Sequence, residues 1–180
     1  TRDLFMNANK IFQASFMLVV TSFLWIAGAS ICGEKPLIFP IPLEIQVREG
    51  RFDVDKSTVI VTYAGGQDSD DVLARMLSYE FVDRYGQPVR IVKRSQIARE
   101  DKFILLGTTA NPLVKSFCEQ NGLMPALLGL GEEGYVLTVS GKSVVVAANS
   151  KKGAMFGLES LRQIVTKEGG SVFIPQLVVK

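Results

Sequence analysis

Apolar residues alternate most regularly between residues 134 and 148, and this alternation predicts a β-hairpin. Strand side chains point alternately to opposite faces, so one face of the first strand carries Tyr135, Leu137 and Val139. Gly141 adopts positive φ at little steric cost and therefore suits the tight turn at residues 140–142. The returning stretch, residues 144–148, is apolar on both faces, which is typical of an interior strand.

A helix is predicted directly after this hairpin. Asn149 and Ser150 are both suitable N-cap residues. The apolar spacing that follows is that of one helix face, which carries Ala154, Leu158, Leu161 and Val165. We also expect Phe156 and Ile164 to be buried, so that the hairpin and the helix share one core.

The first part of the chain predicts short strands followed by a second helix. Alternating residues predict strands at 43–47, 52–54 and 58–63, with a turn at Glu49-Gly50. Ser69 is the expected N-cap of the helix, and Asp70 and Asp71 lie in its first turn, where acids complement the helix dipole. The expected buried face of this helix carries Leu73, Met76, Leu77 and Phe81.

The middle of the chain predicts two short strands, at 88–92 and 103–106, joined by the charged, solvated segment 93–102. Asn111 followed by Pro112 predicts the start of a third helix, which ends at Asn121-Gly122. Its expected buried face carries Leu113, Val114, Phe117 and Cys118. A loop through Met124, Pro125 and Gly129 then leads to the hairpin. With a last strand at 172–179, the chain predicts an α+β fold: a mixed β-sheet with about three helices packed on it.

The N-terminal 32 residues predict a leader. Residues 11–26 are almost entirely apolar, and Ala27-Gly28-Ala29 fits the small-x-small pattern of signal-peptide cleavage. We expect cleavage near Ser30 and a secreted, periplasmic or cell-envelope location. The alternative is an uncleaved membrane anchor, because the apolar run to Cys32 is almost long enough to span a bilayer. Residues 33–42, rich in proline, form a linker, and residues 43–180 form the domain.

Composition and charge exclude several functions. The net charge is +2 with scattered Lys and Arg, which gives no argument for nucleic-acid binding. The chain has no histidine and only two cysteines, so we expect no metal site. Cys118 is expected to be a small core residue rather than a nucleophile. Gly129 to Gly134 matches the pattern G-x-G-x-x-G, but it precedes a strand rather than a helix, so we expect no dinucleotide cofactor.

Two acidic pairs resemble candidate catalytic carboxylates, and both have a structural explanation. Asp70-Asp71 fits a helix N-terminus. Glu132-Glu133 fits a solvated turn, and neighbouring strand residues would in any case point to opposite faces.

A longer motif runs through the hairpin and the last helix. It consists of Glu133-Gly134-Tyr135-x-Leu137-x-Val139, then Ala147-x-Asn149-x-x-x-Gly153-x-x-x-Gly157-Leu158-x-Ser160-Leu161-x-Gln163. This string resembles the N-terminal domain that precedes the catalytic barrel in β-N-acetylhexosaminidases of glycoside hydrolase family 20. The resemblance extends more faintly from about Pro40 to Lys180. A similar domain precedes the barrel in O-GlcNAcase-like enzymes and α-N-acetylglucosaminidases.

The resemblance implies a non-catalytic domain of a secreted glycosidase. The catalytic barrel, absent from this chain, would follow it in the same polypeptide and be its partner, and the glycan substrate would bind there. Family members use an adjacent Asp-Glu pair on the barrel, and this chain contains no such dipeptide. We therefore expect no catalytic, cofactor-binding or metal-binding residue here. The alternative is a stand-alone surface module associated with carbohydrate, but Tyr63, Tyr135 and Phe156 occupy expected core positions rather than a sugar-stacking surface.

Overall fold

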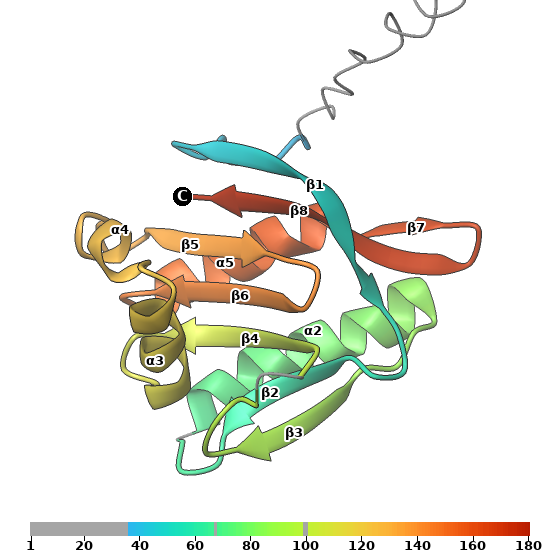
Figure 1. Ribbon diagram of the computed structural model, residues 1–180, viewed down its shortest axis with the longest axis horizontal. Coiled ribbons are helices and arrows are strands. Elements are labelled where there is room, and N and C mark those ends of the chain that lie inside the picture. Colours follow the sequence, from blue (N-terminus) through green and yellow to red (C-terminus); the bar gives the residue numbers. More distant parts are fainter. Residues whose placement is uncertain (1–35, 67, 99–100) are drawn as a thin grey trace, which may run out of the picture. The chain divides into compact units, whose positions relative to one another are not determined.

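The computed structural model describes residues 36–66, 68–98 and 101–180, which form one mixed eight-stranded sheet with helices on both faces (Figure 1). The strands are β1 (Ile45–Val54), β2 (Val59–Tyr63), β3 (Arg90–Arg94), β4 (Phe103–Thr108), β5 (Tyr135–Val139), β6 (Ser143–Ala148), β7 (Thr166–Glu168) and β8 (Ser171–Val179). The helices are α2 (Asp68–Tyr85), α3 (Pro112–Gln120), α4 (Met124–Leu128) and α5 (Lys151–Ile164). The α+β prediction is confirmed, and the predicted leader lies outside the described residues.

Half of the sheet is parallel and half is antiparallel. The order is β1-β8-β5-β6-β4-β2-β3, and β7 pairs antiparallel with residues 171–173 at the start of β8. Strands β3, β2, β4 and β6 run parallel, whereas β5 pairs antiparallel with both β6 and β8, and β8 pairs antiparallel with β1. The predicted hairpin of β5 and β6 is confirmed, and it is the point where the two halves of the sheet meet.

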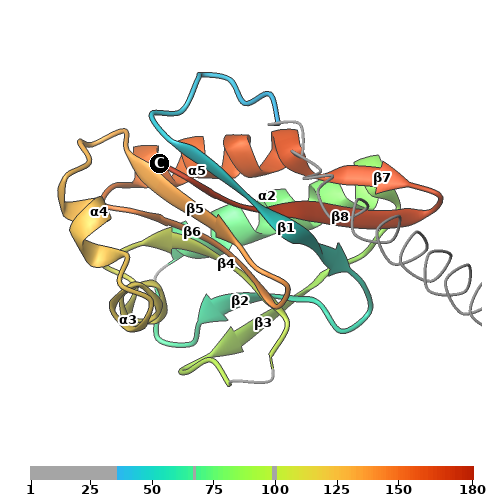
Figure 2. The ribbon, with the colours of Figure 1, turned by 45° about the horizontal axis from the view of Figure 1, so that its top comes forward.

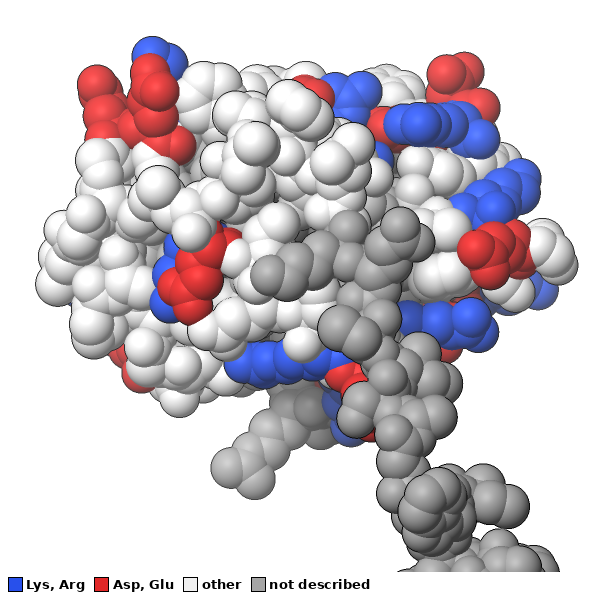
Figure 3. Space-filling view, turned by 90° about the horizontal axis from the view of Figure 1, so that it is seen from above, with Lys and Arg blue, Asp and Glu red and all other residues white. Residues whose placement is uncertain are grey.

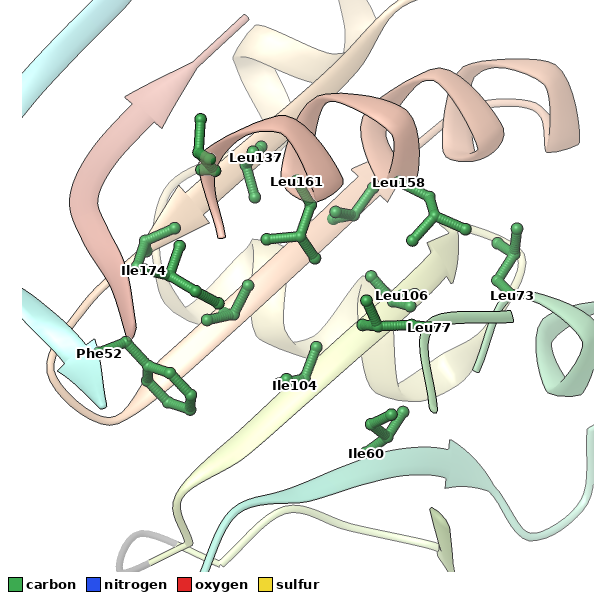
Figure 4. Packing of buried hydrophobic residues seen from close by; sticks show 14 of the residues in the cluster. Phe52, Ile60, Leu73, Leu77, Ile104, Leu106, Leu137, Leu158, Leu161 and Ile174 are labelled. Atoms are coloured by element: carbon green, nitrogen blue, oxygen red, sulfur yellow. The ribbon is translucent and has the colours of Figure 1, made fainter. Parts of the chain in front are cut away.

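Two hydrophobic clusters lie on opposite faces of the sheet. Helices α2 and α5 cover one face, and α3 and α4 cover the other (Figure 2). The alternation of strand side chains divides the residues between them: Ile60 belongs to the α2/α5 cluster, while Val59 and Val61 belong to the α3/α4 cluster. Figure 4 shows the first cluster, in which Leu77 of α2 and Leu161 of α5 point toward Ile104 and Leu106 of β4.

The start of α5 shows which of two possible residues caps the helix. Ser150 is the N-cap, and its Oγ accepts a hydrogen bond from the Gly153 amide at 3.1 Å. Asn149 instead donates its side-chain amide to the Leu127 carbonyl at 2.6 Å, which connects the end of β6 to α4. The predicted face of α5 is buried at Ala154, Leu158 and Leu161. Val165 is the C-cap and lies just beyond the helix.

The predicted turn at Glu49-Gly50 is wrong. Both residues lie within the continuous strand β1, where the pairing with β8 shifts between Val47 and Arg51. A β-bulge accommodates the extra residues, and Gly50 takes the positive φ of +100° that it requires. The predicted strand start at Leu43 is also wrong, because β1 begins at Ile45.

The prediction for α2 is correct in extent but wrong in two details. The helix begins at Asp68, so Ser69 lies inside its first turn and is not the N-cap. Its buried face carries Leu73, Ala74, Leu77 and Phe81. Met76 is 37% exposed and lies at the margin of this face. The buried residues Leu73, Leu77 and Phe81 are four positions apart, whereas Met76 is three positions after Leu73 and therefore points to one side of the face.

Three further predictions are corrected by the structure. Residues 124–128 form the short helix α4 rather than a loop, with Pro125 in its first turn. Strand β3 extends through Lys93 and Arg94, which had been assigned to the solvated connection. Phe156 is only half-buried. Residues two positions apart on a helix point in nearly opposite directions, so Phe156 points away from the side that carries Ala154 and Leu158. Tyr63 and Tyr135 are likewise half-buried, each packed against the edge of a cluster.

Candidate docking surface

Asp71 and Glu133, one residue from each acidic pair that resembles catalytic carboxylates, form ion pairs at the surface. Asp71 Oδ2 lies 3.0 Å from Lys93 Nζ on the edge strand β3. Glu133 Oε1 lies 2.5 Å from Lys152 Nζ at the start of α5, and Glu132 is exposed in the turn before β5. The fold therefore does not bring the two pairs together. Over residues 36–66, 68–98 and 101–180, no group of three Cys, Asp or Glu side chains is placed to hold a metal ion.

The glycine-rich stretch 129–134 leads into strand β5, as its sequence context predicts. Its last glycine serves close packing. A Cβ on Gly153 of α5 would lie only 2.4 Å from the Gly134 carbonyl oxygen, so the backbones of the turn and of α5 pass very near each other. A Cβ on Gly134 would likewise lie 2.4 Å from Leu130 Cβ, so close packing explains Gly134 and Gly153, whereas nothing lies within 4 Å of a Cβ at Gly131.

Cys118 is a core residue, as predicted. It is fully buried on α3 within the α3/α4 cluster. Burial, reinforced by the nearby Glu119 charge, raises the pKa of its thiol to about 11. Since the thiolate is the nucleophilic form, Cys118 is unreactive at neutral pH in the folded domain.

The outer side of α2 carries a stripe of exposed apolar residues beside the charged Arg75, Asp83 and Arg84, and the sequence interpretation missed this stripe. Exposed large apolar residues recur at helical spacing along it: Val72, Met76, Tyr79 and Val82. Tyr79 is 72% exposed. The sequence shows this second apolar stripe as residues that are four, three and three positions apart, next to the stripe of core residues.

A groove of about 770 Å³ lies over the outer sides of α2 and α5. Its lining consists of Met76, Tyr79, Glu80, Val82, Asp83, Arg84 and Arg162. Glu80 of α2 forms an ion pair with Arg162 of α5, and Arg162 Nη1 also donates to Glu159 at 2.7 Å. The Glu80 side chain is only 10% exposed, so its charge is balanced within the groove rather than by water. The ion pairs join α2 to α5 and hold the groove in shape.

The segment 37–43 adds a second apolar strip on the same side of the molecule. Leu37, Phe39, Ile41 and Leu43 are all mostly exposed, whereas Ile38 is buried in the α2/α5 cluster. Two hydrogen bonds of 2.8 Å fix the segment to α5, one from the Phe39 amide to the Gln163 side chain and one from that side chain to the Phe39 carbonyl.

Exposed apolar side chains are therefore concentrated on one face. We call it the helix-side face, and its residues are Leu37, Phe39, Ile41, Leu43, Val72, Met76, Tyr79 and Val82, with half-buried Phe156. Two other large apolar side chains are exposed among the residues that the structure describes: Ile91 on the edge strand β3, and Leu128 on α4, which covers the opposite face of the sheet. Figure 3, seen from above, shows mostly uncharged atoms on its left side, with a few charged groups among them. Apolar surface gathered in this way is typical of protein interaction sites.

The fold is that of an α+β domain with exposed apolar side chains beside its α2/α5 layer. The family model for glycosyl hydrolase family 20, domain 2, matches residues 35–180. The chain belongs to this family of domains.

Solved structures share the fold. The exo-β-N-acetylglucosaminidase of family 20 from Vibrio harveyi, in complex with N-acetylglucosamine, is 19% identical with a TM-score of 0.54, over 81% of this chain and 18% of that chain. The Flavobacterium johnsoniae chitobiase is 20% identical with a TM-score of 0.55, over 81% and 20% of the two chains. CpGH84D is 17% identical with a TM-score of 0.61, over 82% and 24%.

The chain thus spans about a fifth of the length of the solved proteins that it resembles. Comparison with curated proteins gave no match. Within the part of the chain that the structure describes, no helix has both the length and the apolar character to cross a membrane.

Proposed function

We propose that this chain is the non-catalytic N-terminal domain of a secreted β-N-acetylhexosaminidase, which removes terminal N-acetylhexosamine from glycans. Membership of the family-20 domain and the likeness to the Vibrio and Flavobacterium enzymes support this parent. An O-GlcNAcase-like parent is the second candidate, because CpGH84D has the same fold at a slightly higher TM-score. The leader supports secretion on sequence grounds alone.

The helix-side face carries the proposal, because it gives the domain a partner. The outside of a TIM barrel is a ring of helices, and such a surface packs against α2 and α5 by ordinary helix–helix contacts. Tyr79, Met76 and Val82 then become interdomain core residues. The domain supports the barrel, and the barrel carries the chemistry.

The reading frame beyond the codon for Lys180 tests the parent. Family resemblance predicts an Asp, a Pro and an Arg-Gly pair within about a dozen residues, and an adjacent Asp-Glu farther on in a barrel of roughly 250 residues. An Asp-Asp pair in place of Asp-Glu would identify the O-GlcNAcase-like relatives. A stop codon, or an extension without these features, would favour the stand-alone surface module.

Substitution within the full-length parent tests the packing face. Tyr79→Asp combined with Met76→Asp should lower the thermal midpoint of the parent and its hydrolysis of an aryl N-acetylglucosaminide. Leu128→Asp, on the opposite face, is the matched control and should change neither. Equal effects of the two substitutions would show that the helix-side face is not the interface.

Activity and processing are tested on the chain itself. The 180-residue chain should release no chromophore from an aryl N-acetylglucosaminide, and turnover above a boiled control would place the active site here. Mass spectrometry of the exported protein should find an N-terminus near Ser30. An intact start at Met6 would favour the membrane anchor.

A further inference from the structure

The C-terminal end of β8 lies at the base of an apolar slot. Lys180 and Glu44 exchange two backbone hydrogen bonds, of 3.0 and 3.1 Å, and their side chains pair at 2.8 Å. Beyond them is a cavity of about 390 Å³. Its walls are residues 40–43 on one side and residues 130–135 on the other, and Lys180 closes its end.

The register of the sheet shows what fits between these walls. On one side of β8, Ile45 pairs with Val179 and Glu44 with Lys180, so Leu43 is next in line. On the other side of β8, Leu137 of β5 pairs with Val179. Because β5 and β8 are antiparallel, Tyr135 lies opposite the position two residues after Val179. A first residue after Lys180 would therefore lie between Leu43 and Tyr135. The slot follows the path of β8 and has room for one further strand.

We propose that this slot binds an extended polypeptide segment that continues β8, supplied by the residues after Lys180 in a longer protein. The proposal rests on the proposed function, because it requires that more polypeptide follows this domain. The lining is mostly apolar and therefore suits a peptide: Ile41 and Leu43 are 79% and 89% exposed. Pro40, Pro42 and Leu130 add to the apolar wall, and Glu132, Glu133 and Lys180 are the charged residues of the lining.

A continuing chain has an advantage over other occupants of the slot. Its first residue is already at the base of the slot, so binding is intramolecular and has little translational entropy to lose. Strand alternation also fixes which way its side chains point. The first added residue faces the α2/α5 side, as Val179 does, and the second faces the α3/α4 side.

Tails added to the full 180-residue chain test the proposal. One variant ends in Val-Thr-Val-Thr after Lys180, and its matched control ends in Gly-Ser-Gly-Ser. The first tail should raise the thermal midpoint by about 2–6 °C, the amount that a few new cross-strand pairs give. Amide exchange should show protection of its first two residues. Leu43→Asp should abolish both effects, and Leu128→Asp, outside the slot, should abolish neither.

Three results would overturn the proposal. Equal midpoints for the two tails would show that the slot does not accept a strand. Light scattering that gives a dimer, broken by Leu43→Asp in the chain without a tail, would assign the slot to a second copy. A tail that gains protection only after deletion of residues 1–32 would assign it to the N-terminal segment. A stop codon after Lys180 would remove both the proposed function and the natural occupant of the slot, whereas equal midpoints for the two tails would overturn the slot alone and leave the proposed function standing.

Discussion

Tyr135 of β5 and Ser160 of α5 share a hydrogen bond of 2.6 Å between their hydroxyl oxygens. Gly157, one helical turn before Ser160, allows the strand and the helix to come this close. A Cβ built on Gly157 would lie 2.3 Å from Val146 Cγ1 and 3.1 Å from the Tyr135 ring. The close packing of α5 on the sheet therefore depends on the absence of a side chain at Gly157 as well as on the Tyr135–Ser160 contact.

Gly157→Ala should destabilise the domain by about 1–3 kcal/mol, because the added methyl group forces Val146 or the Tyr135 ring out of position. Urea unfolding followed by circular dichroism measures the change. Gly131→Ala is the control, since nothing lies within 4 Å of a Cβ at that position, and it should be nearly neutral. Equal stability of the two variants would mean that α5 can shift away from the sheet at little cost.

Tyr135→Phe should lower the free energy of unfolding by about 1 kcal/mol, because it leaves the buried Ser160 hydroxyl without its partner. Ser160→Ala should cost a similar amount. The double variant should lose less than the two single losses combined, since both remove the same hydrogen bond. Strictly additive losses in a double-mutant cycle would contradict this.

Asp55 should make the stability of the domain sensitive to acid. Burial opposes its ionisation, but hydrogen bonds from Lys102, at 2.5 Å, and from Ser57 outweigh burial and lower its pKa from 3.8 to about 2. A carboxyl group with a lower pKa in the folded state stabilises it above pH 4, and this contribution disappears as the pH falls toward 2. Thermal midpoints of the natural chain and of Asp55→Asn should differ at pH 6 and converge near pH 2. The matched variant Lys102→Gln should behave similarly, and a difference that persists at pH 2 would point to another cause.

Cys118 should react with a thiol reagent only when the domain opens, because its pKa is about 11 and its side chain is buried. The measurement needs the Cys32→Ser background, so that one thiol is counted. Labelling by a chromogenic disulfide at pH 8 should be slow in buffer and rise with the unfolded fraction in urea. Rapid labelling of the folded domain would show that α3 opens locally.

Strong local signals made the C-terminal half of the fold predictable. The hairpin needs only alternation and a turn glycine, and α5 needs only a cap and an apolar stripe, so neighbouring residues determine both. The glycines at 153 and 157 belong to the recognised motif, but the backbone contacts that they permit depend on which strands lie beneath the helix. A single sequence does not contain that information.

The errors concern features that distant residues decide. Glu49-Gly50 has the composition of a turn, yet pairing with β8, more than a hundred residues later, keeps it within one strand as a bulge. Met76 and Phe156 are apolar residues that the sequence placed in the core, whereas the sheet contacts only one side of each helix. The helix-side face was therefore missed, because Met76 and Phe156 were expected in the core and the apolar residues beside them were not considered together.

The position of β8 between β1 and β5 also bears on how the domain is made. Among the described residues, β1 pairs with β8 alone, and β8 leaves the ribosome more than a hundred residues after β1. At about 5–20 residues per second, β1 therefore stays unpaired for on the order of ten seconds during translation. An unpaired strand is an aggregation risk, and charged residues within a strand reduce that risk. β1 carries Arg48, Glu49, Arg51 and Asp53 among its ten residues, which protect the nascent chain until its partner arrives.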